Sequence, residues 1–455
     1  MSPSNTKLAH ETKLLAKLSG PIVIGQVGQN LINLADTVMV GALGALPLSA
    51  SAFAGSIFII ALIAGMGIIS PVTALFAKVQ GQEDYPMGGV LLRHSMIVTL
   101  ITSAVLIAIL FAILPNLSLF GQTPEVLAEG RKFYEIIAWS ILPSLIYQCY
   151  KQFSDGIGKT KVGMTVMLLG VLLNVIGNYV FIYGHWGAPA LGLEGAGYST
   201  LISRIMMAVS MMAYIHLNPA FTKYLQTRWI HRLDHHMLKN MLRLGLPNGL
   251  TYLFEVSAFS FAAIMMGWFG SMPLAAHQIT ISMASMTFLV SVGIGIASSI
   301  RVAYEWGRGD IVMARYAGFT SMKVGGVYSV LCAILILLLR NWLPSLYVKD
   351  VNVIELAAML FIVVGIFQIA DSIQAVAIGA LRGLSDTAWP SAIAFISYWI
   401  VGLPGGYLLA FHMGMGPVGI WIGLLLGLTC TSILLPWRFH YLTNRLLDKP
   451  LHTNS

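Results

Sequence analysis

Charged side chains are scarce in this chain. Asp, Glu, Lys and Arg make up 10% of its 455 residues, whereas the average for soluble proteins is roughly 25%. Hydrophobic residues make up 57% of the chain. This composition argues against a water-soluble fold.

Cysteine is also scarce. Cys149, Cys332 and Cys430 stand far apart, an odd number with no C-x-x-C pair, so we expect neither a disulfide framework nor a thiolate metal site. Residues 1–17 are polar and lack the short apolar core of a cleavable signal peptide.

The sequence patterns of common enzymes are missing. There is no G-x-S-x-G turn and no H-E-x-x-H helix. Residues 156–160 resemble the end of a phosphate-binding loop, but Phe153 stands where the first glycine is required and no βαβ pattern surrounds it. We therefore predict that the chain is not an enzyme and holds no organic cofactor.

Long apolar runs dominate instead. A helix needs about 20 apolar residues to cross a hydrocarbon core about 30 Å thick. Suitable runs fall at 14–39, 49–78, 90–115, 129–151, 160–183, 191–216, 241–268, 275–304, 315–341, 352–381, 387–411 and 416–440. The sequence predicts an all-α integral membrane protein with twelve transmembrane helices.

The net charge of +8 fits membrane topology better than nucleic-acid binding, because the basic residues lie in short loops. With the N-terminus in the cytoplasm, 21 of the 26 Lys and Arg residues fall on the cytoplasmic side, and Arg204 lies within the sixth run. Cytoplasmic loops are enriched in basic residues, so both termini are expected inside.

The sequence repeats itself at an offset of 224 to 227 residues. The matches include Pro21 with Pro247, residues 44–48 with 270–274, Asp84 with Asp310, residues 156–160 with 383–387, and Gly192 with Gly416. We therefore predict two six-helix lobes related by pseudo-two-fold symmetry, an arrangement known in transporters. The lobes would span residues 1–217 and 241–455, joined by a cytoplasmic connector at 218–240.

Three acidic residues lie well inside apolar runs: Asp36, Glu255 and Asp371. A carboxylate in the bilayer core costs at least about 2.5–3.5 kcal/mol, so each should face a cavity or a partner. Few basic residues inside the predicted spans could pair with these acids: Arg204 and His277. The acids are therefore candidate cation or proton sites, with a structural ion pair as the alternative.

The repeat duplicates the scaffold but not the acids. Gln29 stands opposite Glu255 at an offset of 226, and Ser144 stands opposite Asp371 at 227. Glu255 and Asp371 would form one cation site in the C-terminal half. Two neighbouring carboxylates suit exchange between a proton and a metal ion such as Na⁺.

A second polar group is predicted in the N-terminal half. Asn174 and Asn178 are spaced i and i+4 and share one helix face, where Asp36 and Thr200 could join them. Carboxylate, amide and hydroxyl oxygens are ligands that an alkali cation prefers. Interhelical hydrogen bonding explains the same residues equally well.

Several of these residues together resemble a known family. They are Pro21, the pattern Asn33-x-x-Asp36-Thr37-x-Met39-Val40-Gly41, Pro247 with Glu255, Asp371, and the pattern Arg382-Gly383-x-x-Asp386-Thr387. In this combination, across essentially the whole chain, they resemble the multidrug and toxic compound extrusion (MATE) family, and within it the NorM-like branch.

The resemblance implies an exporter of cationic organic drugs or toxins in the bacterial inner membrane, driven by sodium or protons. We expect a monomer, because two related lobes in one chain need no partner. The resemblance also implies a cation site at Glu255 and Asp371, and an N-lobe cation or substrate site at Asp36, Asn174, Asn178 and Thr200. A tyrosine that aids the cation site in some relatives is Phe367 here. Its aromatic face can hold a cation, but the hydroxyl ligand is missing.

Gln29, Phe367 and His277 are further candidates for lining a cavity, although a packed or hydrogen-bonded histidine is the favoured interpretation of His277 and a proton relay the alternative. The alternative function is a flippase for a lipid-linked precursor. That function would need a strongly basic cavity for phosphates, whereas this chain offers acids and Arg204.

Overall fold

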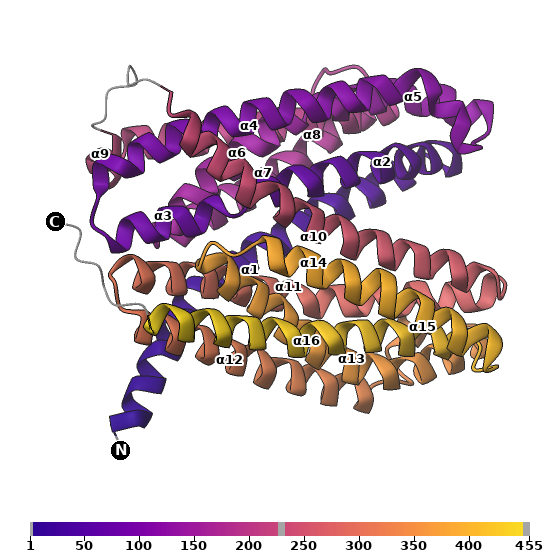
Figure 1. Cartoon of the computed structure of the whole chain (residues 1–455). Helices are drawn as coiled ribbons and strands as arrows, with labels where there is room; N and C mark the ends of the chain where they lie inside the picture. Colours follow the sequence, from indigo (N-terminus) through magenta and orange to yellow (C-terminus); the bar gives the residue numbers. More distant parts are fainter. Residues whose placement is uncertain (1–2, 226–232, 449–455) are drawn as a thin grey trace. The chain divides into compact units, whose positions relative to one another are not determined.

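The computed structural model describes residues 3–225 and 233–448, and every regular element within these ranges is helical (Figure 1). The predicted all-α fold is confirmed. Residues 226–232, which belong to the predicted connector, lie outside the described ranges.

Each predicted apolar run corresponds to one helix or to consecutive helical segments, with four of them in the run 387–411. Ten helical segments of the described chain are long and apolar enough to cross a membrane by length and composition. The runs 14–39 and 129–151 correspond to α1 and to α5 with α6, which carry more polar residues. The chain is therefore a multi-pass membrane protein with twelve helical spans.

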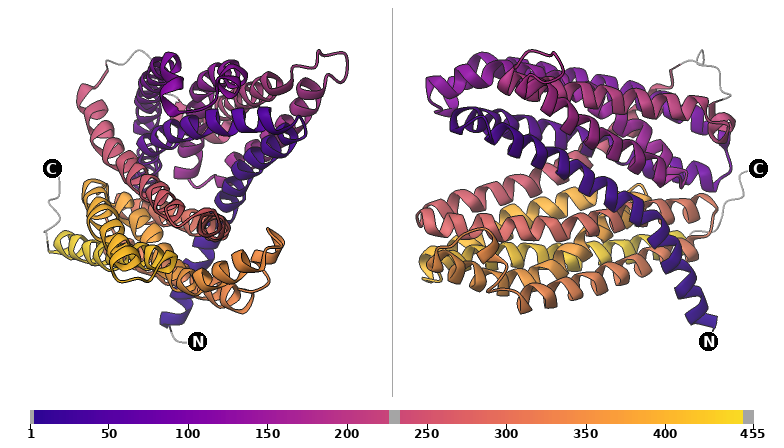
Figure 2. Two further views of the ribbon diagram at one scale, coloured as in Figure 1. Left: turned by 90° about the vertical axis from the view of Figure 1, so that its right-hand side faces the viewer. Right: turned by 180° about the vertical axis from the view of Figure 1, so that it is seen from behind.

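The chain forms two compact units. The N-terminal unit comprises Ile24–Gly249, and the C-terminal unit comprises Met1–Val23 with Leu250–Ser455. These bounds differ from the predicted lobes because α1 and α10 each contribute to both units. Figure 2 shows α1 as one continuous indigo helix in its right-hand view. The lobe boundaries stay a prediction.

The N-terminal unit is a bundle of helices around an aromatic core. Its elements are the later part of α1 (Pro3–Gly41), α2 (Ala45–Ile69), α3 (Val72–Gly81), α4 (Tyr85–Ile113), η1 (Leu114–Phe120), α5 (Pro124–Trp139), α6 (Ile141–Gly156), α7 (Thr160–Tyr183), α8 (Gly192–Leu217), α9 (Pro219–Leu225) and the start of α10 (His235–Gly267). Phe76 and Phe153 meet edge to face at 4.8 Å in the core. Next to them, Lys151 and Asp155 form a buried ion pair of 2.7 Å.

The C-terminal unit repeats this plan. Its elements are the start of α1, the later part of α10, α11 (Ser271–Gly307), α12 (Ile311–Leu338), η2 (Pro344–Leu346), α13 (Val351–Gly383), α14 (Ala388–Phe395), η3 (Ile396–Gly402), α15 (Leu403–Tyr407), η4 (Leu408–His412) and α16 (Pro417–Leu447). The η3 and η4 segments are π-helical turns. Trp421, Phe361 and Phe367 lie fully buried in its core.

The turns of the two halves match in backbone geometry. Asp84 caps α4 by accepting a hydrogen bond from the backbone N–H of Met87, and Asp310 caps α12 by accepting one from that of Met313. Positive φ angles recur at Gly44 and Gly270, Glu83 and Gly309, Gly158 and Ser385, and Gly192 and Gly416. The repeat seen in the sequence is therefore a repeat of structure.

A buried ion network fixes the start of α1 within the C-terminal unit. The Arg301 guanidinium donates two hydrogen bonds to Glu11, at 2.8 and 2.9 Å, and one to Glu305 at 2.7 Å. All three residues are at most 9% exposed. Breaking one link of such a network strands a buried charge, which is destabilising.

We expect Glu11→Gln to lower the free energy of unfolding by about 2 kcal/mol, since one charge-assisted bond is lost while Glu305 still pairs with Arg301. The midpoint of thermal unfolding in detergent measures this effect. Lys13→Gln, at an exposed position on the same helix, is the matched control. Equal midpoints for both variants would show that the network does not stabilise the fold.

Candidate functional site

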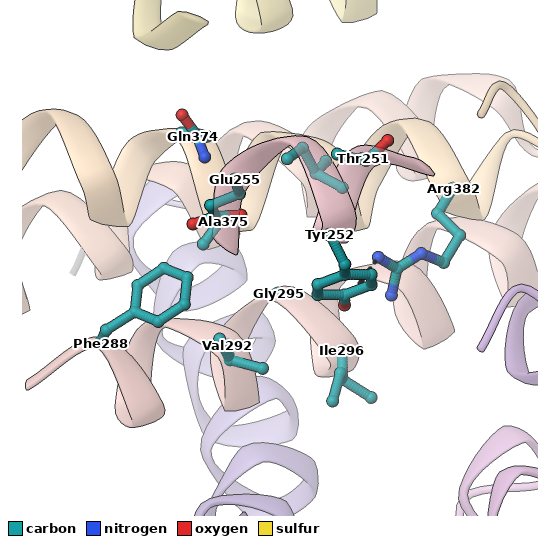
Figure 3. A pocket seen from close by; sticks show the side chains of 11 residues that line it. Thr251, Tyr252, Glu255, Phe288, Val292, Gly295, Ile296, Gln374, Ala375 and Arg382 are labelled. Carbon is teal, nitrogen blue, oxygen red and sulfur yellow. Dashed lines mark hydrogen bonds between the residues drawn. The ribbon is translucent and has the colours of Figure 1, made fainter. Parts of the chain in front are cut away.

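A small cavity in the C-terminal unit lies between α10, α11 and α13 (Figure 3). It has a volume of about 30 Å³ and is lined by Thr251, Tyr252, Glu255, Phe288, Val292, Gly295, Ile296, Gln374, Ala375, Ile378 and Arg382. One water needs roughly 10–15 Å³ measured in this way. The cavity therefore suits a small ion or one or two waters rather than an organic molecule.

Glu255 lies on α10 and lines this cavity. Asp371 lies on α13, one turn before Gln374 and Ala375, and is 5% exposed. The two carboxylates lie close enough for their charges to interact. The structure therefore brings together the two acids that the sequence singled out.

Few neighbouring groups stabilise the negative charge of these two carboxylates. Within the described residues, no Lys, Arg or His lies within 4.0 Å of either carboxylate, and the Oδ1 atom of Asp371 has no hydrogen-bond partner. A buried charge without a partner is costly. A proton or a small cation would remove that cost.

Tyr398 lies near both acids, although no sequence pattern singled it out. Its ring is fully buried, and its hydroxyl lies within electrostatic range of both Glu255 and Asp371. Gln374 donates to the Tyr398 hydroxyl at 2.8 Å and accepts from Thr431 at 2.5 Å. A buried tyrosine hydroxyl needs such a partner. The position of Tyr398 inside an apolar run is the only sign of this need in the sequence.

Tyr398 lies on η3, where the helix widens into a π-turn between α14 and α15. Such turns are rare and often occur at functional sites. In this unit η3 packs against α16, the helix that carries Thr431. The wider turn therefore carries the hydroxyl that is hydrogen-bonded to Gln374, a residue of the cavity lining.

The predicted N-terminal polar group also comes together. Asn178 donates to Oδ1 of Asp36 at 2.7 Å, and Thr200 donates to Oδ2 at 3.0 Å. Asn174 donates to Thr200 at 3.3 Å. Both oxygens of Asp36 are thus engaged, as the hydrogen-bonding alternative requires, while Oδ1 of Asn178 has no partner among the described residues and remains an acceptor for a cation.

The other candidate residues lie elsewhere. His277 and Phe367 pack on the Trp421 ring at centroid distances of 5.5 Å each, and the ring nitrogens of His277 have no hydrogen-bond partner among the described residues. Neither residue lines the cavity at Glu255. Gln29 lines a separate cavity in the N-terminal unit.

Comparison with known proteins identifies the family. One family model, MatE, matches the chain twice, over residues 21–180 and 247–408. The chain belongs to the MatE family. Both matches begin at the equivalent prolines Pro21 and Pro247, as expected if the family unit was duplicated.

Similar MatE proteins cover almost the whole chain. It is 33% identical over 438 residues to a probable multidrug resistance protein NorM of Rhizobium meliloti, covering 95% of this chain and 94% of that protein. It is 32% identical over 441 residues to the multidrug resistance protein MdtK of Edwardsiella ictaluri, covering 96% of each.

Solved structures give the same fold. A MATE protein crystallised in a bent conformation superposes with a TM-score of 0.88 at 20% identity, covering 96% of each chain. As a MatE protein, the chain is a membrane transporter of small molecules and not an enzyme.

Proposed function

We propose that the chain is an antiporter that exports cationic organic drugs or toxins across the bacterial inner membrane in exchange for Na⁺ or H⁺. The observation that carries this proposal is the pair Glu255 and Asp371, two buried acids within electrostatic range of each other, neither of which forms an ion pair among the described residues. The relatives named for multidrug resistance support the cargo class.

The size of the cavity at Glu255 supports separate binding sites for the coupling ion and the drug. About 30 Å³ accommodates the coupling ion but not an aromatic drug. The ion and the drug would then influence each other's binding indirectly, because each would bind one conformational state of the protein more tightly than another. Coupling of this kind requires differential affinity between the states, not direct contact between the ligands.

The N-terminal polar group is the second proposed cation or substrate site. Its carboxylate, amide and hydroxyl oxygens fit a hard cation such as Na⁺. The two asparagine side chains would have to turn their oxygens toward the ion, since their amide groups now serve as donors to Asp36 and Thr200. Ion binding would therefore rearrange the contact between α1, α7 and α8.

A flippase of lipid-linked phosphates is the less favoured function. The acids at the C-terminal site have the same sign of charge as a phosphate and would repel it. Both termini in the cytoplasm and a monomeric state belong to the proposal, because the distribution of basic residues favours that topology and each chain already contains two units.

Transport into sealed vesicles tests the proposal. Inside-out vesicles containing the purified protein receive a fluorescent organic cation, and Na⁺ and pH gradients are imposed separately. We expect accumulation of the dye against its gradient with one of the two ions. Equilibration without accumulation under both gradients would refute antiport and indicate a passive channel.

A further inference from the structure

The N-terminal unit contains a second cavity, of about 20 Å³, lined by Gln29, Ile32, Leu62, Met66, Ser144, Tyr147, Gln148, Arg204 and Met207. It corresponds by sequence offset to the cavity at Glu255. Five of its lining positions match lining positions there: Gln29 with Glu255, Leu62 with Phe288, Met66 with Val292, Tyr147 with Gln374, and Gln148 with Ala375. The duplication has therefore preserved the cavity in both halves.

The charged groups at this cavity differ from those at its counterpart, which is lined by both Glu255 and Arg382. Gln29 stands where the other half has Glu255, and Ser144 stands where it has Asp371. Arg204 adds a positive charge, while the equivalent residue at an offset of 224 is the buried Leu428. The N-terminal cavity thus has a guanidinium with neutral polar groups and no acid in its lining, whereas the C-terminal cavity has Glu255 beside Arg382.

Arg204 is buried and only partly satisfied. It is 7% exposed, donates one hydrogen bond to Ser140 at 2.6 Å, and stacks on the Phe58 ring at 4.8 Å. A guanidinium has five N–H donors, and its other donors have no acceptor among the described residues. A buried arginine of this kind needs further acceptors.

Asp36 does not supply them. It is the acidic residue close enough to influence Arg204 electrostatically, but no ion pair within 4.0 Å joins the two, and both Asp36 oxygens already accept from Asn178 and Thr200. The donors of Arg204 are therefore available to an occupant of the cavity.

We propose that this cavity is an anion subsite, in which Arg204, Gln29 and Gln148 bind one monovalent anionic group. The group is either a free halide or the carboxylate of an amphoteric organic substrate. Guanidinium and amide donors are the groups that bind carboxylates in proteins. The volume limits the occupant to one such group, with the remainder of an organic substrate outside the cavity.

Binding of two matched dyes to the full-length protein in detergent tests the proposal, which rests on the proposed export function only for the choice of dyes. One dye is a zwitterionic rhodamine with a free carboxylate, and the other is its methyl ester. We expect Arg204→Gln to raise the Kd of the acid relative to that of the ester by about tenfold, the effect of one lost charge-assisted hydrogen bond. Arg204→Lys keeps the charge and should retain most of the preference.

A second variant leaves Arg204 in place. Gln29→Glu introduces at this cavity the acid found at position 255, so it should weaken binding of the acid dye relative to the ester. Gln29→Met is the size-matched neutral control and should shift the ratio by less than about twofold. If Arg204→Gln does not fold, this pair decides the question.

Replacing chloride by gluconate separates the two sources of the anion. If the occupant is free chloride, the replacement lowers the thermal unfolding midpoint of the wild type but not that of Arg204→Gln. The ratio of the Kd of the acid dye to that of the ester is then the same in the wild type and in Arg204→Gln. If neither dye binds the wild type, the dyes are not its cargo and this chloride comparison alone decides. Equal effects of Arg204→Gln on both dyes, together with no dependence on chloride, would overturn the anion subsite.

Discussion

Asp371→Asn should insert and fold normally but lose cation-driven export of organic cations by about hundredfold, near the upper end of typical coupling between two ligands. The asparagine preserves the shape of the side chain beside Glu255 but removes the negative charge and the protonatable group. A coupling ion then gains little from entering the site. The rate of dye transport in sealed vesicles, measured once with a Na⁺ gradient and once with a pH gradient, shows the size of this loss.

The same substitution elsewhere on the helix provides the control. Asp350→Asn changes the residue that caps α13, whose side chain accepts from the backbone N–H of Asn352 at 2.9 Å. Asparagine caps helices as well as aspartate does, so export should remain. Full export by Asp371→Asn, at wild-type levels of inserted protein, would show that Asp371 does not couple transport.

Gly379→Ala should prevent stable folding of the C-terminal unit. A Cβ atom at position 379 would lie 2.0 Å from the carbonyl oxygen of Gly295 on α11, far inside van der Waals contact. A Cβ at Gly383 would likewise lie 2.9 Å from the Ser299 oxygen, one turn along. Because both obstacles are backbone atoms, α11 and α13 would have to separate, at a cost of about 3 kcal/mol or more.

Gly326→Ala is the matched control for this prediction. Gly326 lies on α12 with no atom within 4 Å of an added Cβ, and alanine is favoured over glycine in a helix by about 1 kcal/mol. The yield of folded protein and the thermal unfolding midpoint should fall for Gly379→Ala alone. Similar values for both variants would mean that α11 and α13 have room to adjust.

The sequence predicted the scaffold because the signals for it are local. Apolar runs mark the helices, and Asp84, Asp310 and the paired glycines mark turns that recur with the same caps and positive φ angles. The isolated acids could be found for the same reason, since a carboxylate in an apolar run is conspicuous without any knowledge of its neighbours.

Contacts between residues that are far apart in the sequence could not be predicted from such local patterns. Glu11 stands in a polar N-terminal segment and looks exposed, yet Arg301, 290 positions away, makes it a buried residue. Tyr398 looked like one more aromatic residue of an apolar run until Gln374 and Thr431 were placed around it. The lining of the cavity at Arg204 likewise depends on four helices that meet only in the folded chain.

The sharing of α1 and α10 between the units has a consequence for synthesis on the ribosome. The N-terminal unit has all of its residues once Gly249 has been made, so it can assemble while translation continues. The first part of α1 is made first, but it belongs to the unit that resumes at Leu250, and Arg301, the partner of Glu11, is made much later. The first part of α1 must therefore wait without its final neighbours until the second half of the chain has been made.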